Sequence, residues 1–181
     1  MNVTTELLSR IDDYHLPLWE EKEVIIKRGE VLHNQGNINT NIYYVLEGAL
    51  HLYHETETDS NTIRFGYKDS IFALLDSFLT NKPSAYTAQA IRKTRLRVMN
   101  KESFMEFIYS DMENIKLWNE ILSYVVTAQL ERETDLLASL PQERYESVLK
   151  RSPQLFKEIP HRYIASYLRM APETLSRLQK S

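Results

Sequence analysis

Cysteine is absent from the 181-residue sequence, which excludes disulfides, thiolate nucleophiles, thiolate zinc sites and cysteine-ligated iron–sulfur clusters together. Long apolar runs are lacking too, because no uninterrupted stretch approaches the roughly 20 residues that span a bilayer. The first residues, MNVTTELLSRIDDYHL, carry charges and contain no apolar run like that of a signal peptide. We therefore expect no membrane partner and a cytoplasmic location.

Groupings typical of catalysis are also missing. The sequence shows no Ser/His/Asp arrangement, no pair of acids with a pocket, and no glycine-rich phosphate loop. His51 and His54 are three apart on an expected strand, so they point to opposite faces and make a poor metal pair. We expect no enzyme, no metal site and no cofactor, although a haem held by one of the five histidines stays open.

Glycine is scarce, and its placement is informative. The four glycines stand at 29, 36, 48 and 66, and none follows. Around them, "EVIIKRGEVLHNQGN" and "IYYVLEGALHLYHE" alternate apolar and polar residues and turn at glycine, which is typical of short antiparallel strands. "SAYTAQAIRKTRLRVMN" adds two more strands rich in β-branched and aromatic residues. The pattern predicts a β-sandwich or β-roll over 22–99, after a helix over 2–20.

From Lys101 the pattern becomes helical, with neither glycine nor proline until Pro141. Within 111–138, residues at alternating steps of three and four form a heptad seam. The seam consists of Ile115, Trp118, Leu122, Val125, Gln129, Arg132 and Leu136. A second stripe beside it consists of Leu117, Ile121, Tyr124 and Ala128. A small sheet and a short tail can hardly cover both, so we favour a homodimer formed by the seam over burial of both stripes in one subunit.

Pro141 opens a further helix, "PQERYESVLKRS", and "SPQLF" is expected to be a short connection. "HRYIASYLRMAPETLSRLQ" then reads as two short helices that break near Arg169-Met170. Apolar residues at Ile164, Leu168, Leu175 and Leu178, with small Ala165 at the crossing, predict a helix-turn-helix. Residues 141–181 hold eight Lys/Arg and four Asp/Glu, a net +4, which leaves −7 for residues 1–140.

The second of these helices carries side chains suited to the major groove of DNA. Arg177 suits guanine, Glu173 one turn earlier suits the cytosine amino group, and Thr174 suits a thymine methyl or a phosphate. His161, Arg162 and Lys180 are placed to hold phosphates. The alternative is a helical hairpin in which Glu173 and Arg177 form a solvated i,i+4 salt bridge.

The order of a β-roll with glycine turns, a long helix and a helix-turn-helix resembles the Crp/Fnr family of bacterial transcription regulators over nearly the whole chain. The strongest match is "PETLSR", by which Glu173, Ser176 and Arg177 would read bases and Thr174 would contact the DNA backbone. The resemblance implies an α+β fold: an N-terminal antiparallel β-roll that serves as sensor domain (1–110), a dimerisation helix (111–138) and a helix-turn-helix domain (139–181). Its implied partners are double-stranded DNA, a second copy of the chain and RNA polymerase.

Two departures from the family concern the DNA-binding segment. Arg169 stands where the family usually has glycine in the turn, so a left-handed conformation there would cost about 1–2 kcal/mol unless the turn differs or Arg169 gains a phosphate contact. Only Gln179, Lys180 and Ser181 follow the second helix, so we expect no full wing.

The stretch "DSIFALLDSFLTNKPSAYT" resembles the family's cyclic-nucleotide pocket. Family members hold the ribose with Gly-Glu and the cyclic phosphate with Arg-Ser, whereas this chain has Phe72-Ala73 and Pro83-Ser84 at those places. Proline supplies neither a cation nor an N–H donor, so we expect no tight cyclic AMP binding. An effector pocket for another molecule would involve Phe72, Ala73, Pro83, Ser84, Tyr86 and Gln129. A filled β-roll core is the alternative.

The sequence thus predicts a homodimeric regulator that reads a palindromic DNA site. The alternative function is a small-molecule-binding or protein-interaction module whose tail does not read DNA. Arg169 in the turn, the short end and the net charge of −3 favour that alternative.

Overall fold

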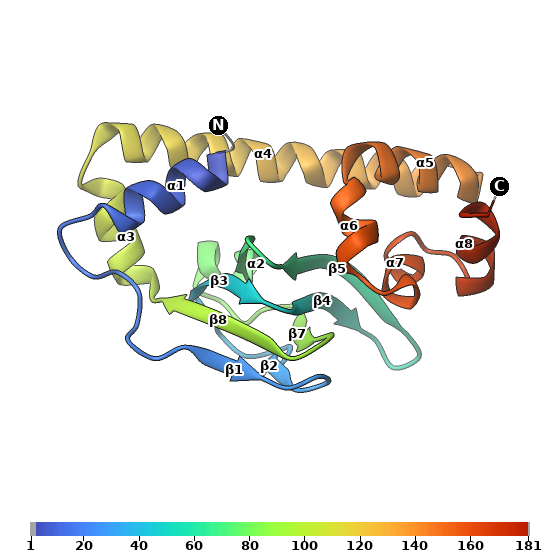
Figure 1. The fold of residues 1–181 in the computed structure, drawn as a ribbon, viewed down its shortest axis with the longest axis horizontal. Helices are drawn as coiled ribbons and strands as arrows, with labels where there is room; N and C mark the ends of the chain where they lie inside the picture. The colour runs from blue at the N-terminus through green and yellow to red at the C-terminus, as the bar shows by residue number, and fades with distance from the viewer. Residues whose placement is uncertain (1–2, 181) are drawn as a thin grey trace.

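The computed structural model describes residues 3–180, and its centre is an antiparallel β-roll. The strands form two four-stranded sheets, ordered β1-β8-β3-β6 and β2-β7-β4-β5 (Figure 1). The strand bounds are Val24–Ile26 (β1), Val31–His33 (β2), Ile42–Glu47 (β3), Ala49–Glu55 (β4), Ser60–Tyr67 (β5), Ile71–Ala73 (β6), Thr87–Ala90 (β7) and Thr94–Met99 (β8). The roll expected over 22–99 is confirmed. One short helix inside it, α2 (Leu75–Thr80), was not expected.

Two glycines are required by close approaches in the roll. Gly48 joins β3 to β4 with φ +90°, and a Cβ there would lie 2.2 Å from the carbonyl oxygen of Lys93. Gly66 is not in a turn: it lies within β5, where a Cβ would lie 2.8 Å from the ring of Phe72. A side chain at either position would therefore displace a neighbour.

A long helix, α4 (Met112–Leu137), runs along the roll, and the other helices except α2 gather at its two ends (Figure 1). Near its start lie α1 (Val3–Asp12) and α3 (Lys101–Tyr109). Near its end lie α5 (Pro141–Arg151), α6 (Pro153–Glu158), α7 (His161–Tyr167) and α8 (Pro172–Leu178).

Two expectations about helices were wrong. The first helix ends at Asp12 rather than at residue 20. Pro17 opposes a helix that continues to residue 20, because proline disfavours helical backbone at the residue before it. The stretch "SPQLF" is not a plain connection but belongs to α6, which begins at Pro153. Proline suits that first position because its missing N–H has no partner in a helix.

Three apolar clusters hold the chain together. One packs α1, α3 and the first half of α4 against Ile42, Phe78 and Met99. The second fills the roll around Leu50, Phe72 and other residues of both sheets. The third joins α5–α8 to Ala49 and Ile91 of the roll, so the C-terminal helices pack directly on the sheet.

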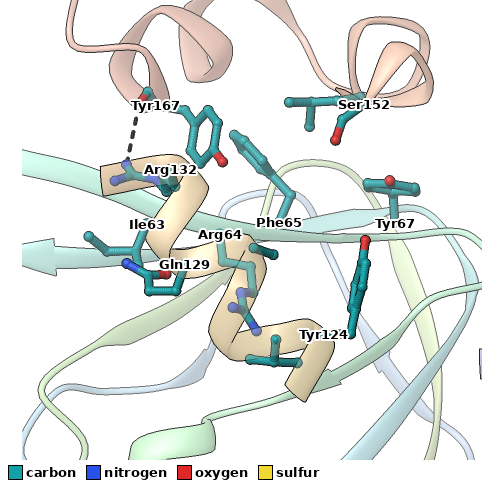
Figure 2. A pocket seen from close by; sticks show the side chains of 12 residues that line it. Ile63, Arg64, Phe65, Tyr67, Tyr124, Gln129, Arg132, Ser152 and Tyr167 are labelled. Carbon is teal, nitrogen blue, oxygen red and sulfur yellow. Dashed lines mark hydrogen bonds between the residues drawn. The ribbon is translucent and has the colours of Figure 1, made fainter. Parts of the chain in front are cut away.

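Polar contacts also join the C-terminal helices to the open edge of β5. The Thr62 N–H donates to Ser166 Oγ at 3.2 Å, and the Thr62 carbonyl accepts from Arg132 Nη2 at 3.0 Å. The same Nη2 donates to the Tyr167 carbonyl at 3.2 Å, the dashed contact in Figure 2. An edge strand needs such partners for its outward backbone groups. Here α4 and α7 provide them.

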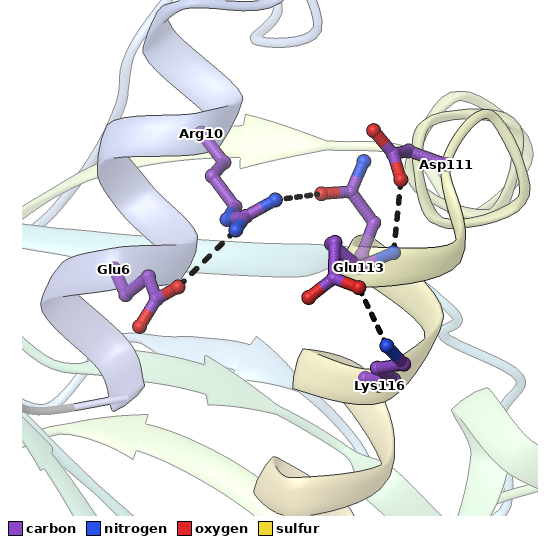
Figure 3. Close-up of polar contacts among 6 residues, drawn as sticks. Glu6, Arg10, Asp111, Glu113 and Lys116 are labelled. Carbon is purple, nitrogen blue, oxygen red and sulfur yellow. Dashed lines mark hydrogen bonds and ion pairs between the residues drawn. The ribbon is translucent and has the colours of Figure 1, made fainter.

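The start of α4 is fixed by a second polar group, shown in Figure 3. Arg10 on α1 donates to Asn114 Oδ1 at 3.2 Å and pairs with Glu6 one turn earlier. Asp111 caps α4 by accepting from the Glu113 N–H at 2.9 Å. These contacts hold α1 against the long helix.

Among residues 3–180, no helix is both long enough and apolar enough to cross a bilayer.

Candidate nucleic-acid interface and sensor pocket

Helices α7 and α8 cross over a small, fully buried core. Ile164, Ala165, Leu168 and Leu175 are each at most 1% exposed. Leu178, the fourth apolar residue expected there, is half-buried. The predicted pair of short helices and its break are therefore present, and Ala165 stands in the buried core as the sequence indicated.

The turn between them closes with left-handed backbone at Arg169, where φ is +54°. The Met170 N–H donates to the Ala165 carbonyl at 3.0 Å and the Arg169 N–H to the Ser166 carbonyl at 3.1 Å. This pair of bonds is the Schellman arrangement that normally uses glycine at the left-handed position. The Arg169 guanidinium contacts Asn61 of the β4–β5 hairpin, which ties the turn to the roll.

Sequence reasoning missed Arg144 on α5, which supports the same turn. Its Nε donates to the Leu168 carbonyl at 3.0 Å and its Nη1 to the Ala138 carbonyl at 2.7 Å. A cation at a helix C-terminus is favourable because the free carbonyls carry partial negative charge. Its position inside the helix expected from Pro141 gives no signal of this role in the sequence.

The outward face of α8 carries the expected base readers. Glu173, Ser176, Arg177 and Lys180 line one shallow surface together with Pro172. Thr174 is half-buried on the same helix. The structure therefore brings the three expected base readers and Lys180 together on one open face.

The other expected backbone contacts lie at the start of α7. His161 and Arg162 are both exposed. The Arg162 guanidinium lies 4.5 Å from the ring centroid of Tyr163. Tyr163 also meets His51 of the roll, with ring centroids 4.7 Å apart. Burial lowers the pKa of His51 below its ordinary value of 6.5, and the positive charge of Arg162 lowers it further.

Much of the expected dimer seam on α4 is engaged within the subunit. The Trp118 ring lies 5.2 Å from that of Phe104 and 5.9 Å from that of Phe78. Arg132 is 6% exposed, and Ile115 packs on the first apolar cluster. Leu122, Val125 and Leu136 are half-buried, and Gln129 is exposed.

A different face of α4 is left open. Val126 and Leu130 are each 59% exposed, and Leu137 is 79% exposed. Their spacing of four and seven residues places them on one side of the helix. The exposed apolar line is thus rotated by about one residue from the seam read in the sequence, because Trp118 and Arg132 turn toward the roll.

Half of the expected effector residues surround a cavity of about 350 Å³ between the roll and α4. Ala73, Tyr86 and Gln129 line it, together with Arg64, Asp76 and Val125 among others. Phe72, Pro83 and Ser84 do not line it. Phe72 is 2% exposed in the core of the roll, and Pro83 is exposed to solvent.

An internal carboxylate occupies the donors next to that cavity. Asp76 Oδ1 accepts from Ser84 Oγ at 3.0 Å, and Asp76 Oδ2 accepts from the Ala85 N–H at 2.8 Å. Ser84 is 1% exposed. A hydroxyl and a backbone N–H that would suit an incoming anion are therefore already paired with a negative group of the chain itself.

Comparison with known proteins agrees with this architecture. Residues 23–111 match the family model of the cyclic nucleotide-binding domain. No curated protein matches the sequence significantly. Among solved structures, FixK2 from Bradyrhizobium japonicum is 20% identical with a TM-score of 0.72, and the match covers 88% of this chain and 82% of FixK2. A CooA mutant from Carboxydothermus hydrogenoformans is 15% identical with a TM-score of 0.71, over 96% and 82% of the two chains.

TTHA1359 from Thermus thermophilus, a transcriptional regulator of the CRP/FNR family, is 21% identical with a TM-score of 0.63, over 87% of this chain and 83% of that one. At such identities the likeness establishes the fold, which is that of CRP/FNR-type regulators around a cyclic nucleotide-binding-like roll. The resemblance and the fold class expected from the sequence are confirmed.

Proposed function

We propose that the chain, which has the fold of CRP/FNR-type transcriptional regulators, is a sequence-specific DNA-binding regulator that acts as a homodimer. The observation that carries the proposal is the exposed face of α8, where Glu173, Ser176 and Arg177 stand together on a helix held by a buried crossing. A helix presented in this way fits the major groove, where Arg and Glu distinguish base edges.

The open line on α4 supports the dimer. Val126, Leu130 and Leu137 are large apolar side chains left exposed along one side of a long helix. A second copy of the same helix would bury them in a self-complementary contact. Two α8 helices about 34 Å apart would then read the two halves of a palindromic site. RNA polymerase would be a further partner of such a regulator.

In this proposal, the sensor roll has lost the groups with which family members hold cyclic AMP. Pro83 stands at the position of the phosphate-binding arginine, and Ser84 and Ala85 are already bonded to Asp76. A cyclic phosphate brought to those donors would meet the Asp76 carboxylate and be repelled. The effector in this proposal is therefore a molecule chemically different from cyclic AMP.

The test is a selection of random duplex DNA on the purified full chain, repeated with Arg177→Ala and Lys157→Ala. Lys157 is an exposed cation on α6, away from α8, so Lys157→Ala removes the same charge as Arg177→Ala. We expect a palindromic consensus that loses discrimination at one base pair in each half-site with Arg177→Ala and is unchanged with Lys157→Ala. No enrichment with the wild type, with or without cell extract, would support the module that does not read DNA.

A further inference from the structure

A second cavity lies where the roll, the long helix and the C-terminal helices meet, and the proposed function leaves it unused. Its volume is about 240 Å³. Strand β5 contributes Arg64, α4 contributes Tyr124 and Arg132, and the C-terminal helices contribute Leu155 and Tyr167. These side chains surround the cavity in Figure 2. It adjoins the cavity beside Asp76, and the two share Ile63, Arg64, Val125 and Gln129 in their linings.

The charged side chains that line this cavity are all positive. The lining contains two guanidinium groups, from Arg64 and Arg132, and none of its residues is Asp or Glu. The other polar groups are the hydroxyls of Tyr67, Tyr124 and Tyr167, the Ser152 hydroxyl and the Gln129 amide, all of which can donate hydrogen bonds to an anion.

Arg64 has no partner in the part of the chain that the structure describes. It makes neither a hydrogen bond nor an ion pair with residues 3–180, although it is half-buried under α4. Burial lowers the pKa of its guanidinium, and the groups that offset this effect are the phenols of Tyr167, Tyr124 and Tyr86 rather than carboxylates. A cation that is partly withdrawn from water in this way destabilises the fold unless something pairs with it.

The hydrogen-bond donors of Arg132 are only partly paired. Arg132 is 6% exposed, its Nη2 bonds to two carbonyl oxygens, and its buried Nε has no partner among residues 3–180. Asp135 stabilises the charge of Arg132 through space, but its oxygens are bonded to Arg151 and Ser147. The cavity is therefore lined by two guanidinium groups and by no carboxylate.

We propose that this cavity binds a small organic anion, with Arg64 and Arg132 facing its carboxylate or phosphate group and with apolar side chains around its body. Val125, Ala128 and Leu155 supply the apolar wall. The volume lies below the roughly 300 Å³ at which ligand pockets usually begin, so the ligand is a small aromatic or short-chain acid rather than a nucleotide.

The position of the cavity would link the ligand to the C-terminal helices. Tyr167 and Arg132 line the cavity and also form the contact that joins α7 to α4 and β5. A ligand that binds them favours one arrangement of α7 over others. This regulatory use rests on the proposed function, whereas binding itself does not and is measured without DNA.

The test is calorimetric titration of the full chain with benzoate, phenyl phosphate, inorganic phosphate and the neutral benzamide. We expect benzoate or phenyl phosphate to bind, and the stronger of the two identifies the head group. Benzamide and inorganic phosphate should bind at least about tenfold more weakly, because each lacks either the charge or the apolar body. Equal affinity for benzamide, or for inorganic phosphate, would overturn the proposal.

Arg64→Met is the decisive variant, and Arg28→Met is its matched control in the exposed turn between β1 and β2. Arg64→Met should weaken anion binding by roughly tenfold or more, while Arg28→Met should leave it unchanged. Arg64→Met should also raise the Tm of the unliganded protein, because an unpaired, half-buried charge is removed. A variant that is folded, with a Tm at or above that of the wild type, and still binds the anion as tightly would contradict the site. Loss of DNA selection with anion binding retained would count against the proposed function alone.

Discussion

The guanidinium of Arg132 lies over the ring of Tyr167, 4.5 Å from its centroid, and the same group donates to the Tyr167 carbonyl. One side chain of the long helix thus holds both the ring and the backbone of α7. Because Arg132 also bonds to Thr62 in the roll, it is a common point of all three parts of the subunit.

Replacing Arg132 with Met should therefore loosen this junction. Two buried carbonyl oxygens lose a donor, so we expect the free energy of unfolding to fall by about 1–3 kcal/mol, measured by urea denaturation. Arg144→Met is a useful comparison, because it removes bonds to the ends of α4 and α7 and none to the roll. Hydrogen exchange at the Thr62 and Ser166 amides should rise in the Arg132 variant only. Unchanged exchange at both amides would show that the junction does not depend on Arg132.

His51 should make the stability depend on pH. Its pKa in the folded chain lies below 6.5 because of burial, so the unfolded chain binds more protons as pH falls below 6.5. The contribution of neutral His51 to the free energy of unfolding is therefore fully present above pH 6.5. It declines as the pH falls from 6.5 toward the pKa of His51 in the folded chain.

The measurement is Tm between pH 7.5 and 5 for the wild type, His51→Gln and His15→Gln. His15 is exposed and serves as the control. We expect a shallower decline in His51→Gln and an unaltered decline in His15→Gln. Some slope should persist in His51→Gln, because burial also lowers the pKa of His33. Parallel curves for all three proteins would rule out a contribution from His51.

Leu130→Glu should separate the proposed dimer. A carboxylate at this exposed point of α4 would face its counterpart across the two-fold contact, so like charges and lost apolar burial both oppose association. Ile38→Glu is the control, because Ile38 is exposed to the same 59% and lies on the roll. Light scattering should give half the wild-type mass for Leu130→Glu and the wild-type mass for Ile38→Glu. A wild type that is monomeric at every concentration would refute the dimer itself.

Asp76→Ala should expose the donors of Ser84 and Ala85. Loss of their acceptor is expected to lower the stability by about 1–3 kcal/mol, and added sulfate should restore part of the lost Tm by taking the place of the carboxylate. Asp13→Ala, at an exposed position after α1, should show neither effect. Cyclic AMP should give no binding heat with the wild type. A measurable affinity of the wild type for cyclic AMP would contradict the proposed loss of that ligand.

The sequence could predict what depends on local pattern. Glycines at turns, the long glycine-free helix and the apolar spacing of Ile164, Leu168 and Leu175 specify the roll, α4 and the crossing of α7 and α8. Left-handed backbone at Arg169 is one outcome that the family resemblance indicates, because the family usually has glycine at this turn. The expected base readers share a face because helical spacing alone places them there.

The sequence could not predict what depends on contacts between distant segments. The heptad pattern on α4 fitted two neighbouring stripes, and only the packing of Trp118 on Phe104 decides which side faces the roll. The pairing of Asp76 with Ser84 depends on how α2 folds back over the following loop. Arg64 did leave a signal, because strand alternation puts it on the same face as inward-facing Gly66. A charged residue at an inward position indicates a buried cation that needs a partner.

The third apolar cluster has a consequence for how the chain unfolds. The C-terminal helices share their core with Ala49 and Ile91, which belong to the roll. A fragment made of residues 139–181 would therefore lack part of its own interior and should not melt cooperatively when produced alone. In the full chain, the same sharing should make both parts lose structure in a single transition, and proteases should cut the stretch after α4 no sooner than that transition begins.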